Sequence, residues 1–242
     1  MSEWFDGIKA QFILNFVEKS RWRYLLTGLF NTLKITFFAV LIGIALGTVI
    51  AIVRSTADRN LNAMRHGPGR TILSFFDKIC RLYLTVVRGT PVVIQLMIFY
   101  YVIFASSRNS VLIAIISFGL NSAAYVAEVV RGGIMSVDIG QTEAGRSLGF
   151  NYVQTMWLIV VPQALKNVLP ALANEFIVLL KETSVAGYVA IKDLTKGGDI
   201  IRGATYSPFM PLIAVALIYL VLVVFFSWLV GKLERRLRNS DH

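Results

Sequence analysis

Two carboxylates, Glu175 and Glu182, lie in the otherwise apolar segment 169–191. Their spacing of seven residues places them two turns apart along one face of a helix. Charged groups inside such a segment are costly, so they usually face a cavity or a partner group. The two carboxylates could therefore receive an ammonium group or a cationic side chain of a substrate. Lys181 could instead meet a substrate carboxylate, or pair with one glutamate in a structural network that ties helices together.

Smaller polar groups lie in similarly apolar surroundings. Asn121 and Tyr125 are four residues apart and share a helix face. Ser122, beside them, could bind a zwitterionic substrate or hydrogen-bond its own backbone. Gln95 could bind substrate or serve the packing between helices. The candidate substrate-binding residues, which include two hydroxyl residues directly after the second glutamate, are Glu175, Glu182, Asn121, Ser122, Tyr125, Gln95, Thr183 and Ser184.

The sequence favours neither covalent nor metal chemistry. His66 and His242 are isolated and have no companions at the spacing of metal ligands. A phosphate-cradling loop of the type Gly-x-x-x-x-Gly-Lys-Ser/Thr is missing, and GPGRT at 67–71 does not match it. We therefore expect a chain that is not an enzyme and that holds no cofactor or metal of its own.

The elements that position these residues are predicted to be membrane helices. Of the 242 residues, 56% are hydrophobic and 16% are charged, against roughly 25% charged in ordinary soluble domains. Segments of about 20 apolar residues are long enough to cross a bilayer. We predict an all-α, polytopic transmembrane domain over 31–231. Its five spans are expected at about 35–53, 86–105, 111–130, 169–191 and 211–230.

Basic residues set the predicted orientation. They concentrate after the first span, after the third span and in the tail 232–242, and basic loops stay in the cytoplasm. Five spans then put the N-terminal segment 1–30 outside and the tail inside. Residues 2–24 form either an amphipathic helix at the outer interface or a lead-in anchored by Trp22 and Tyr24. The net charge of +10 follows this flanking pattern, so we expect a lipid membrane and no nucleic acid among the partners.

Two short patterns predict packing within the membrane domain. Gly43, Gly47 and Ala51 form a row of small residues that permits close helix approach. Glu128 and Arg131 are three residues apart and are expected to pair in a structural role.

A polar loop at about 138–162 interrupts the apolar segments with the stretch EAGRSLGF. A short helix ended by Gly149, and a second one over 152–161, would form a helix-turn-helix able to enter a groove on a partner. Glu143 and Arg146 are three residues apart and can pair on one helical face. A solvated loop is the alternative.

The spacing in this loop resembles the EAA signature of ABC importer permeases. That signature is Glu-Ala-Ala, three residues, Gly, nine residues, Ile, one residue and Leu-Pro; Gly145 and Val161 stand where Ala and Leu are usual. The stretches VRGTPVVIQL, AAYVAEVVRGGI, IGQTEAGRSLGF, VVPQALKNVLPAL and LLKETSVAG resemble the polar-amino-acid uptake branch of that family. The chain therefore resembles a type I ABC importer permease over about 31–231.

The resemblance implies the permease fold and an ATP-driven amino acid importer in the bacterial inner membrane. Its implied partners are two ATP-binding subunits, which hold ATP and Mg, a second permease subunit of the same or homologous sequence, and an extracytoplasmic amino-acid-binding protein. The residues implied to couple to the ATPase are Glu143, Ala144, Gly145, Arg146, Ser147 and Gly149.

Three alternatives remain at this point. The chain could be an ABC permease for another small polar solute. It could be an ion-gradient-driven secondary transporter in which Glu175 and Glu182 bind ions or protons. It could also be a membrane scaffold that does not transport.

Overall fold

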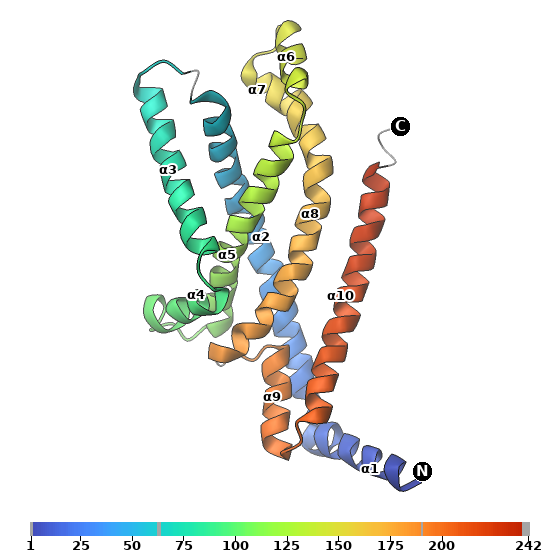
Figure 1. Ribbon diagram of the computed structural model, residues 1–242. Helices are drawn as coiled ribbons and strands as arrows, with labels where there is room; N and C mark the ends of the chain where they lie inside the picture. The colour runs from blue at the N-terminus through green and yellow to red at the C-terminus, as the bar shows by residue number, and fades with distance from the viewer. Residues whose placement is uncertain (1, 62–63, 190, 239–242) are drawn as a thin grey trace. The chain divides into compact units, whose positions relative to one another are not determined.

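A computed structural model describes residues 2–61, 64–189 and 191–238 of the chain (Figure 1). Every regular element in these ranges is a helix, which confirms the predicted all-α class. Residue 1 of the expected N-terminal segment and residues 239–242 of the expected tail, including His242, lie outside the described residues.

The helices follow one another with short connections. In chain order they are α1 (Ser2–Phe12), η1 (Ile13–Val17), η2 (Glu18–Ser20), α2 (Trp22–Asn60), α3 (Pro68–Arg88), α4 (Val92–Ile98), η3 (Phe99–Ile103), α5 (Ser110–Met135), α6 (Ile139–Ser147), α7 (Tyr152–Thr155), η4 (Met156–Val160), α8 (Val161–Glu182), η5 (Thr183–Val189), α9 (Leu194–Thr205) and α10 (Phe209–Arg238).

Several of these helices are long and apolar enough to cross a membrane. Within the described residues, four stretches meet this description: Trp22–Asn60, Ser110–Met135, Tyr152–Val189 and Phe209–Leu237. A bent pair, Pro68–Arg88 with Val92–Ile103, turns by 105° and adds a fifth if the pair is one span. The structure thus holds four or five candidate spans.

The expected single span over 86–105 needs correction. Helix α3 ends at Arg88 with Gly89 as its C-cap, and α4 begins at Val92. Pro91 has no N–H to continue the helical hydrogen bonds, and its ring disfavours helical backbone at the residue before it. Apolar composition alone does not reveal such a break, so it predicts one span where the structure has parts of two helices.

The other expected spans differ from the observed helices mainly at their ends. Residues 35–53, 111–130 and 211–230 lie inside the longer helices α2, α5 and α10. The expected span 169–191 begins within α8, but that helix ends at Glu182 and the tighter η5 follows it.

The chain divides into two compact units. The first unit consists of Met1–Phe38, Val92–Phe118 and Ile177–Trp228, and the second of Ala39–Pro91, Gly119–Phe176 and Leu229–His242. The buried core of the first unit contains Phe16, Leu25, Leu194, Ile201 and Val215. The buried core of the second unit contains Ala51, Val126, Val130, Ile134, Val137, Val160, Ala164 and Val168.

The predicted close approach of small residues is confirmed in the second unit. A Cβ added to Gly47 would lie 2.7 Å from the Cβ of Val126, and one on Gly43 would lie 2.7 Å from Ser122 Oγ. Ala51 is fully buried in the core of the same unit. Along this row, the backbone of α2 therefore packs directly against side chains of α5.

The N-terminal segment is helical, and hydrogen bonds join it to the rest of the first unit. Asn15 in η1 is buried; its Nδ2 donates to Ser207 Oγ at 3.2 Å, and its Oδ1 accepts from Thr205 Oγ1 at 2.8 Å. Trp4 and Phe5 in α1 are exposed. An outer-interface position for residues 2–24 stays a prediction.

Candidate functional site

Helix α6 is a short, well-capped helix at the centre of the expected coupling loop. It begins after Asp138, whose carboxylate accepts a hydrogen bond from the Gly140 N–H at 2.6 Å. It ends where Gly149 adopts φ = +85°, in the left-handed region that favours glycine. The N–H of Phe150 bonds to the Gly145 carbonyl at 3.1 Å and that of Gly149 to Arg146 at 3.0 Å. These two bonds form a Schellman turn, which stops the helix where the sequence predicted.

The chain then starts a new helix with a capping box. The Asn151 side chain accepts from the Gln154 N–H at 2.9 Å, and Gln154 Oε1 accepts from the Asn151 N–H at 2.9 Å. These reciprocal bonds satisfy backbone donors at the start of α7. The helix-turn-helix predicted for this loop is therefore present.

One face of α6 packs and the other is open. Gly145 is buried, and a Cβ there would lie 2.8 Å from Ile159 Cδ1 and 2.9 Å from Thr155 Cγ2. The departure from alanine at this position thus allows a close approach of α6 to the following helices. The open face carries the other expected coupling side chains, Glu143, Ala144, Arg146 and Ser147.

Glu143 and Arg146, which could pair on one helical face, do not form an ion pair in the structure. Both side chains are exposed. They line a cavity of about 610 Å³, and residues at the ends of α2 and α5 line it as well. An exposed pair gains little against the side-chain entropy that it costs.

Arg59, near the end of α2, joins α6 to the helix before it. Its Nη2 donates to the Ile134 carbonyl at 2.8 Å, and its Nη1 lies 3.4 Å from Thr142 Oγ1. A guanidinium at the last turn of α5 also complements the negative end of that helix. The sequence gives no signal for this role of Arg59, because nothing in the local pattern identifies a carbonyl 75 residues away.

A buried ion-pair network in the second unit was also missed. Asp77 of α3 is buried and forms ion pairs with two arginines. Its Oδ1 lies 2.6 Å from Nη1 of Arg54 in α2, and its Oδ2 lies 2.8 Å from Nε of Arg81. The expected pair of Glu128 and Arg131 is formed at 3.1 Å in α5. Asp77 is an acidic residue within an apolar stretch of the sequence, and this signal could have identified it as a member of a buried ion pair.

Two of the candidate substrate residues meet in the second unit. Ser122 Oγ on α5 donates to Glu175 Oε1 on α8 at 3.0 Å. Asn121 and Ser122 are both buried, whereas Tyr125 is partly exposed and has the Arg88 guanidinium 5.9 Å from its ring centre. The alternative in which Ser122 bonds only its own backbone is therefore not what the structure shows.

The remaining candidates belong to the first unit. Gln95 lies in α4, and Glu182 is the last residue of α8. Thr183 is buried and donates to the Leu180 carbonyl at 2.8 Å. Ser184 lines a separate recess of that unit. The structure thus brings Ser122 and Glu175 together, and it does not assemble all eight candidates in one unit.

The described part of the chain shows no candidate metal site. No group of three or more His, Cys, Asp and Glu side chains there is arranged to hold a metal ion.

Comparison with known proteins covers most of the chain. Residues 67–239 match the family described as binding-protein-dependent transport system inner membrane component. The arginine transport system permease protein ArtQ of Bacillus subtilis (strain 168) is 35% identical over 221 residues, which are 90% of this chain and 94% of that protein. The L-cystine transport system permease protein TcyB of the same organism is 30% identical over 224 residues, covering 91% and 89%.

Solved structures agree with this. A crystal structure of an amino acid ABC transporter with histidines is 38% identical, with a TM-score of 0.79 over 91% of this chain and 98% of that one. An inward-facing structure of the MetNI methionine ABC transporter has a TM-score of 0.74 at 20% identity, over 91% and 98% of the two chains. The second likeness shows the fold alone.

The family and the several apolar helices make this a multi-pass inner membrane protein. Permeases of this kind work with ATPase and binding-protein partners, and ATP hydrolysis lies in the separate ATPase subunits. The chain belongs to the binding-protein-dependent transport system inner membrane components, as a permease subunit of a type I ABC importer in the polar amino acid branch.

Proposed function

We propose that this chain forms the translocation path for a polar amino acid and is driven through α6 by an ATPase subunit. The observation that carries the proposal is the geometry of α6. Gly145 is packed against the following helices, the Schellman turn fixes the end of the helix, and Glu143, Ala144, Arg146 and Ser147 remain exposed. A rigid polar helix with one free face suits insertion into a cleft of a partner.

The proposed assembly has two permease subunits, the same or homologous, and two ATP-binding subunits that hold ATP and Mg. A substrate-loaded binding protein delivers the amino acid from outside. Closure of the ATPases would pull α6 and bias the permease toward its outward-open conformation, and hydrolysis would reverse this. Arg59 supports such coupling, because it ties Thr142 of α6 to the end of α5.

The proposed orientation has the N-terminus outside and the C-terminus in the cytoplasm. It follows from the basic residues that flank the helices. With the bent pair α3–α4 counted as one crossing, α6 then lies in the cytoplasm and α9 outside.

The proposed substrate contacts centre on Glu175. Its carboxylate is held by the Ser122 hydroxyl, so it is oriented to receive an ammonium group or a cationic side chain. The relatives named above are described as permeases for arginine and cystine, and both compounds carry an α-ammonium group. Asn121, Tyr125, Gln95, Glu182, Thr183 and Ser184 remain proposed contacts.

The sharpest test of the coupling role is Glu143→Lys in the reconstituted importer. We expect insertion and ATP turnover to persist while ATP-driven uptake falls roughly tenfold or more, because a reversed charge at a docked interface is strongly unfavourable. Glu234→Lys is the matched control, since Glu234 is exposed and lies in the proposed cytoplasmic end of α10. Wild-type uptake by the Glu143 variant would contradict the docking role of α6.

The family assignment also decides against the ion-gradient alternative. Uptake into vesicles should therefore require ATP and should not be restored by a proton or sodium gradient alone.

A further inference from the structure

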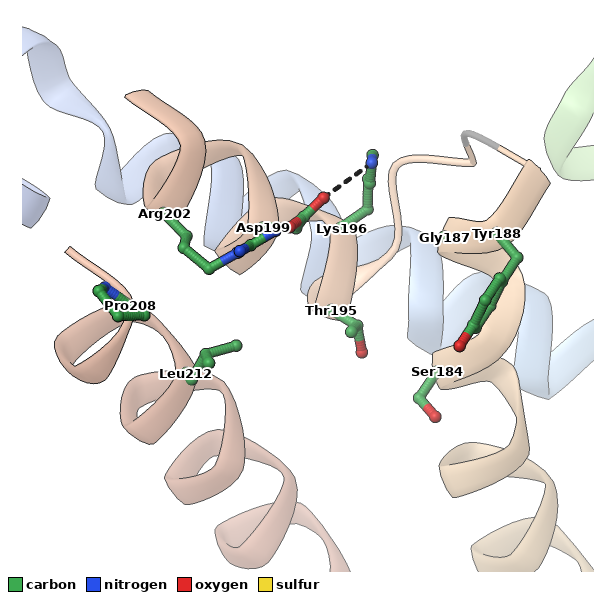
Figure 2. Close-up of a pocket in the computed structure, with 9 residues that line it drawn as sticks. All are labelled: Ser184, Gly187, Tyr188, Thr195, Lys196, Asp199, Arg202, Pro208 and Leu212. Atoms are coloured by element: carbon green, nitrogen blue, oxygen red, sulfur yellow. Dashed lines mark hydrogen bonds and ion pairs between the residues drawn. The ribbon is translucent and has the colours of Figure 1, made fainter. Parts of the chain in front are cut away.

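A recess of about 550 Å³ opens in the first unit. Figure 2 shows its side chains, which come from η5, α9, the connection after α9 and the start of α10. The lining residues are Ser184, Gly187, Tyr188, Thr195, Lys196, Asp199, Arg202, Pro208 and Leu212. We name it the α9 recess.

The helix that forms one wall of the recess is rigidly seated. A Cβ on Gly197 would lie 2.6 Å from the Tyr24 carbonyl oxygen, and one on Gly198 would lie 2.5 Å from Val215 Cγ2. Leu194 and Ile201 are fully buried on the same helix. With one face packed this closely, α9 presents its polar face in a fixed position. A preorganised surface costs less ordering entropy on binding.

The charged groups of the recess leave one positive charge uncompensated. Lys196 Nζ lies 2.9 Å from Asp199 Oδ2, and Arg202 Nε donates to Asp199 Oδ1 at 3.0 Å (Figure 2). The hydrogen bonds from Lys196, and then from Arg202, lower the pKa of the Asp199 carboxyl and keep it ionised. The Asp199 carboxylate thus pairs with both cations of the recess. Lys196 and Arg202 still have N–H groups that can donate to a ligand, whereas the lining contains no second carboxylate. It is suited to an anion.

The recess and the helix α9 carry exposed residues of a type common at protein interfaces. Tyr188 in the recess is 75% exposed, and Tyr206, the C-cap of α9, is 93% exposed. Tyrosine and arginine are enriched in protein–protein interfaces because they combine a large contact area with polar ends.

We propose that the α9 recess docks an acidic side chain of the extracytoplasmic binding protein, with Lys196 and Arg202 as its partners. This rests on the proposed function, because the proposed orientation places α9 outside, where the binding protein arrives. The charge and the exposed tyrosines favour a protein carboxylate over a free zwitterionic substrate. A zwitterion would also need an open acceptor for its ammonium group.

The test uses the complete importer in proteoliposomes, with purified, substrate-loaded binding protein titrated from outside. In the variant Arg202→Glu, the binding-protein concentration for half-maximal uptake should rise roughly tenfold. Arg202→Lys should stay near wild type. Arg108→Glu is the control, because Arg108 is exposed on the same proposed side and does not line the recess.

Asp199→Asn separates docking from structural damage. It removes a carboxylate and leaves both cations unneutralised, so the half-maximal concentration should fall below wild type and become more sensitive to salt. If Asp199→Asn instead weakens docking as Arg202→Glu does, the triad is structural and the proposal is overturned. An unchanged half-maximal concentration in Arg202→Glu overturns it as well.

Two further outcomes would assign the recess to another ligand and overturn the proposal. One is an effect of Arg202→Glu that appears only in vesicles containing anionic lipid. The other is an effect on uptake without binding protein. Failure of the proposed function is distinguishable, because the wild-type complex would then show no ATP-dependent uptake at any binding-protein concentration.

Discussion

At the scale of single residues, the contact between Ser122 and Glu175 turns two candidate positions into a testable pair. Glu175 Oε1 accepts a hydrogen bond from the Ser122 hydroxyl at 3.0 Å, and a carboxylate can accept several hydrogen bonds at once. Ser122 also lies where Gly43 leaves room for it, so the hydroxyl is confined. This hydrogen bond supports the proposed role of Glu175 as a substrate contact.

Glu175→Gln should weaken transport while leaving ATPase docking intact. A hydrogen bond to a charged group contributes about 1.5–3 kcal/mol, so the KM for an amino acid should rise roughly tenfold or more. Ser122→Ala should have a smaller effect of the same sign, because it loosens the carboxylate without removing it. Uptake kinetics and co-purification of the ATPase measure the two properties. An unaltered KM and rate in Glu175→Gln would point to a structural network instead.

Sequence reasoning found both residues of this pair but not their contact. Each stood out as a polar group in an apolar stretch, which is a local signal. Their contact joins positions 53 residues apart and depends on how two helices pack. For the same reason the partners of Arg59 and Asp77 could not be predicted, although the residues themselves were visible.

At the scale of elements, α6 was the most predictable part of the molecule. The glycine that ends it and the Asn-x-x-Gln capping box after it act within a few residues, so the sequence alone specifies them. The break between α3 and α4 was missed even though its cause, Pro91, is also local. Average hydropathy over a window hides where a helix must stop.

Helix α9 yields a prediction about pH. Asp193 caps its start, accepting from the Lys196 and Thr195 N–H groups at 2.9 and 3.1 Å, and the side chain is fully buried. Burial raises its pKa from 3.8 to about 6, and the hydrogen bonds only partly offset this. Nearby, Tyr219 of α10 places its hydroxyl 3.5 Å from Thr195 Oγ1.

A raised pKa means that the folded state favours the protonated acid. The associated stability is fully present below about pH 3.8 and is lost as the pH rises through about 6. Above that pH the ionised form costs the fold about 3 kcal/mol.

Asp193→Asn keeps a cap acceptor without the charge. It should therefore raise the thermal unfolding temperature at pH 7.5, change it little at pH 4, and flatten the slope between. Unfolding of the detergent-solubilised chain across this range measures it. Asp193→Ala, which loses the cap, should be destabilised by about 1 kcal/mol relative to Asn at every pH. Equal slopes for the wild type and the Asn variant would contradict the assignment of this titration to Asp193.

At the scale of the whole molecule, the membrane topology depends on the bent pair. Counted as one crossing, α3 with α4 and η3 makes five spans and leaves α6 in the cytoplasm, where an ATPase can reach it. Counted as a re-entrant loop, it makes four spans, and α6 would emerge on the outside with the same N-terminal orientation. Hydropathy and length do not distinguish these cases, because both contain the same apolar residues.

Cysteine labelling across the bent pair decides between them. Cys80 is the single cysteine of the chain, so Cys80→Ala gives a clean background for His66→Cys, before α3, and Ser107→Cys, after η3. A membrane-impermeant maleimide applied to intact cells should modify position 107 and reach position 66 only after permeabilisation, because basic residues hold the segment around His66 in the cytoplasm. Modification of both positions from the same side would make the pair re-entrant, would place α6 outside, and would remove the basis for coupling through Glu143.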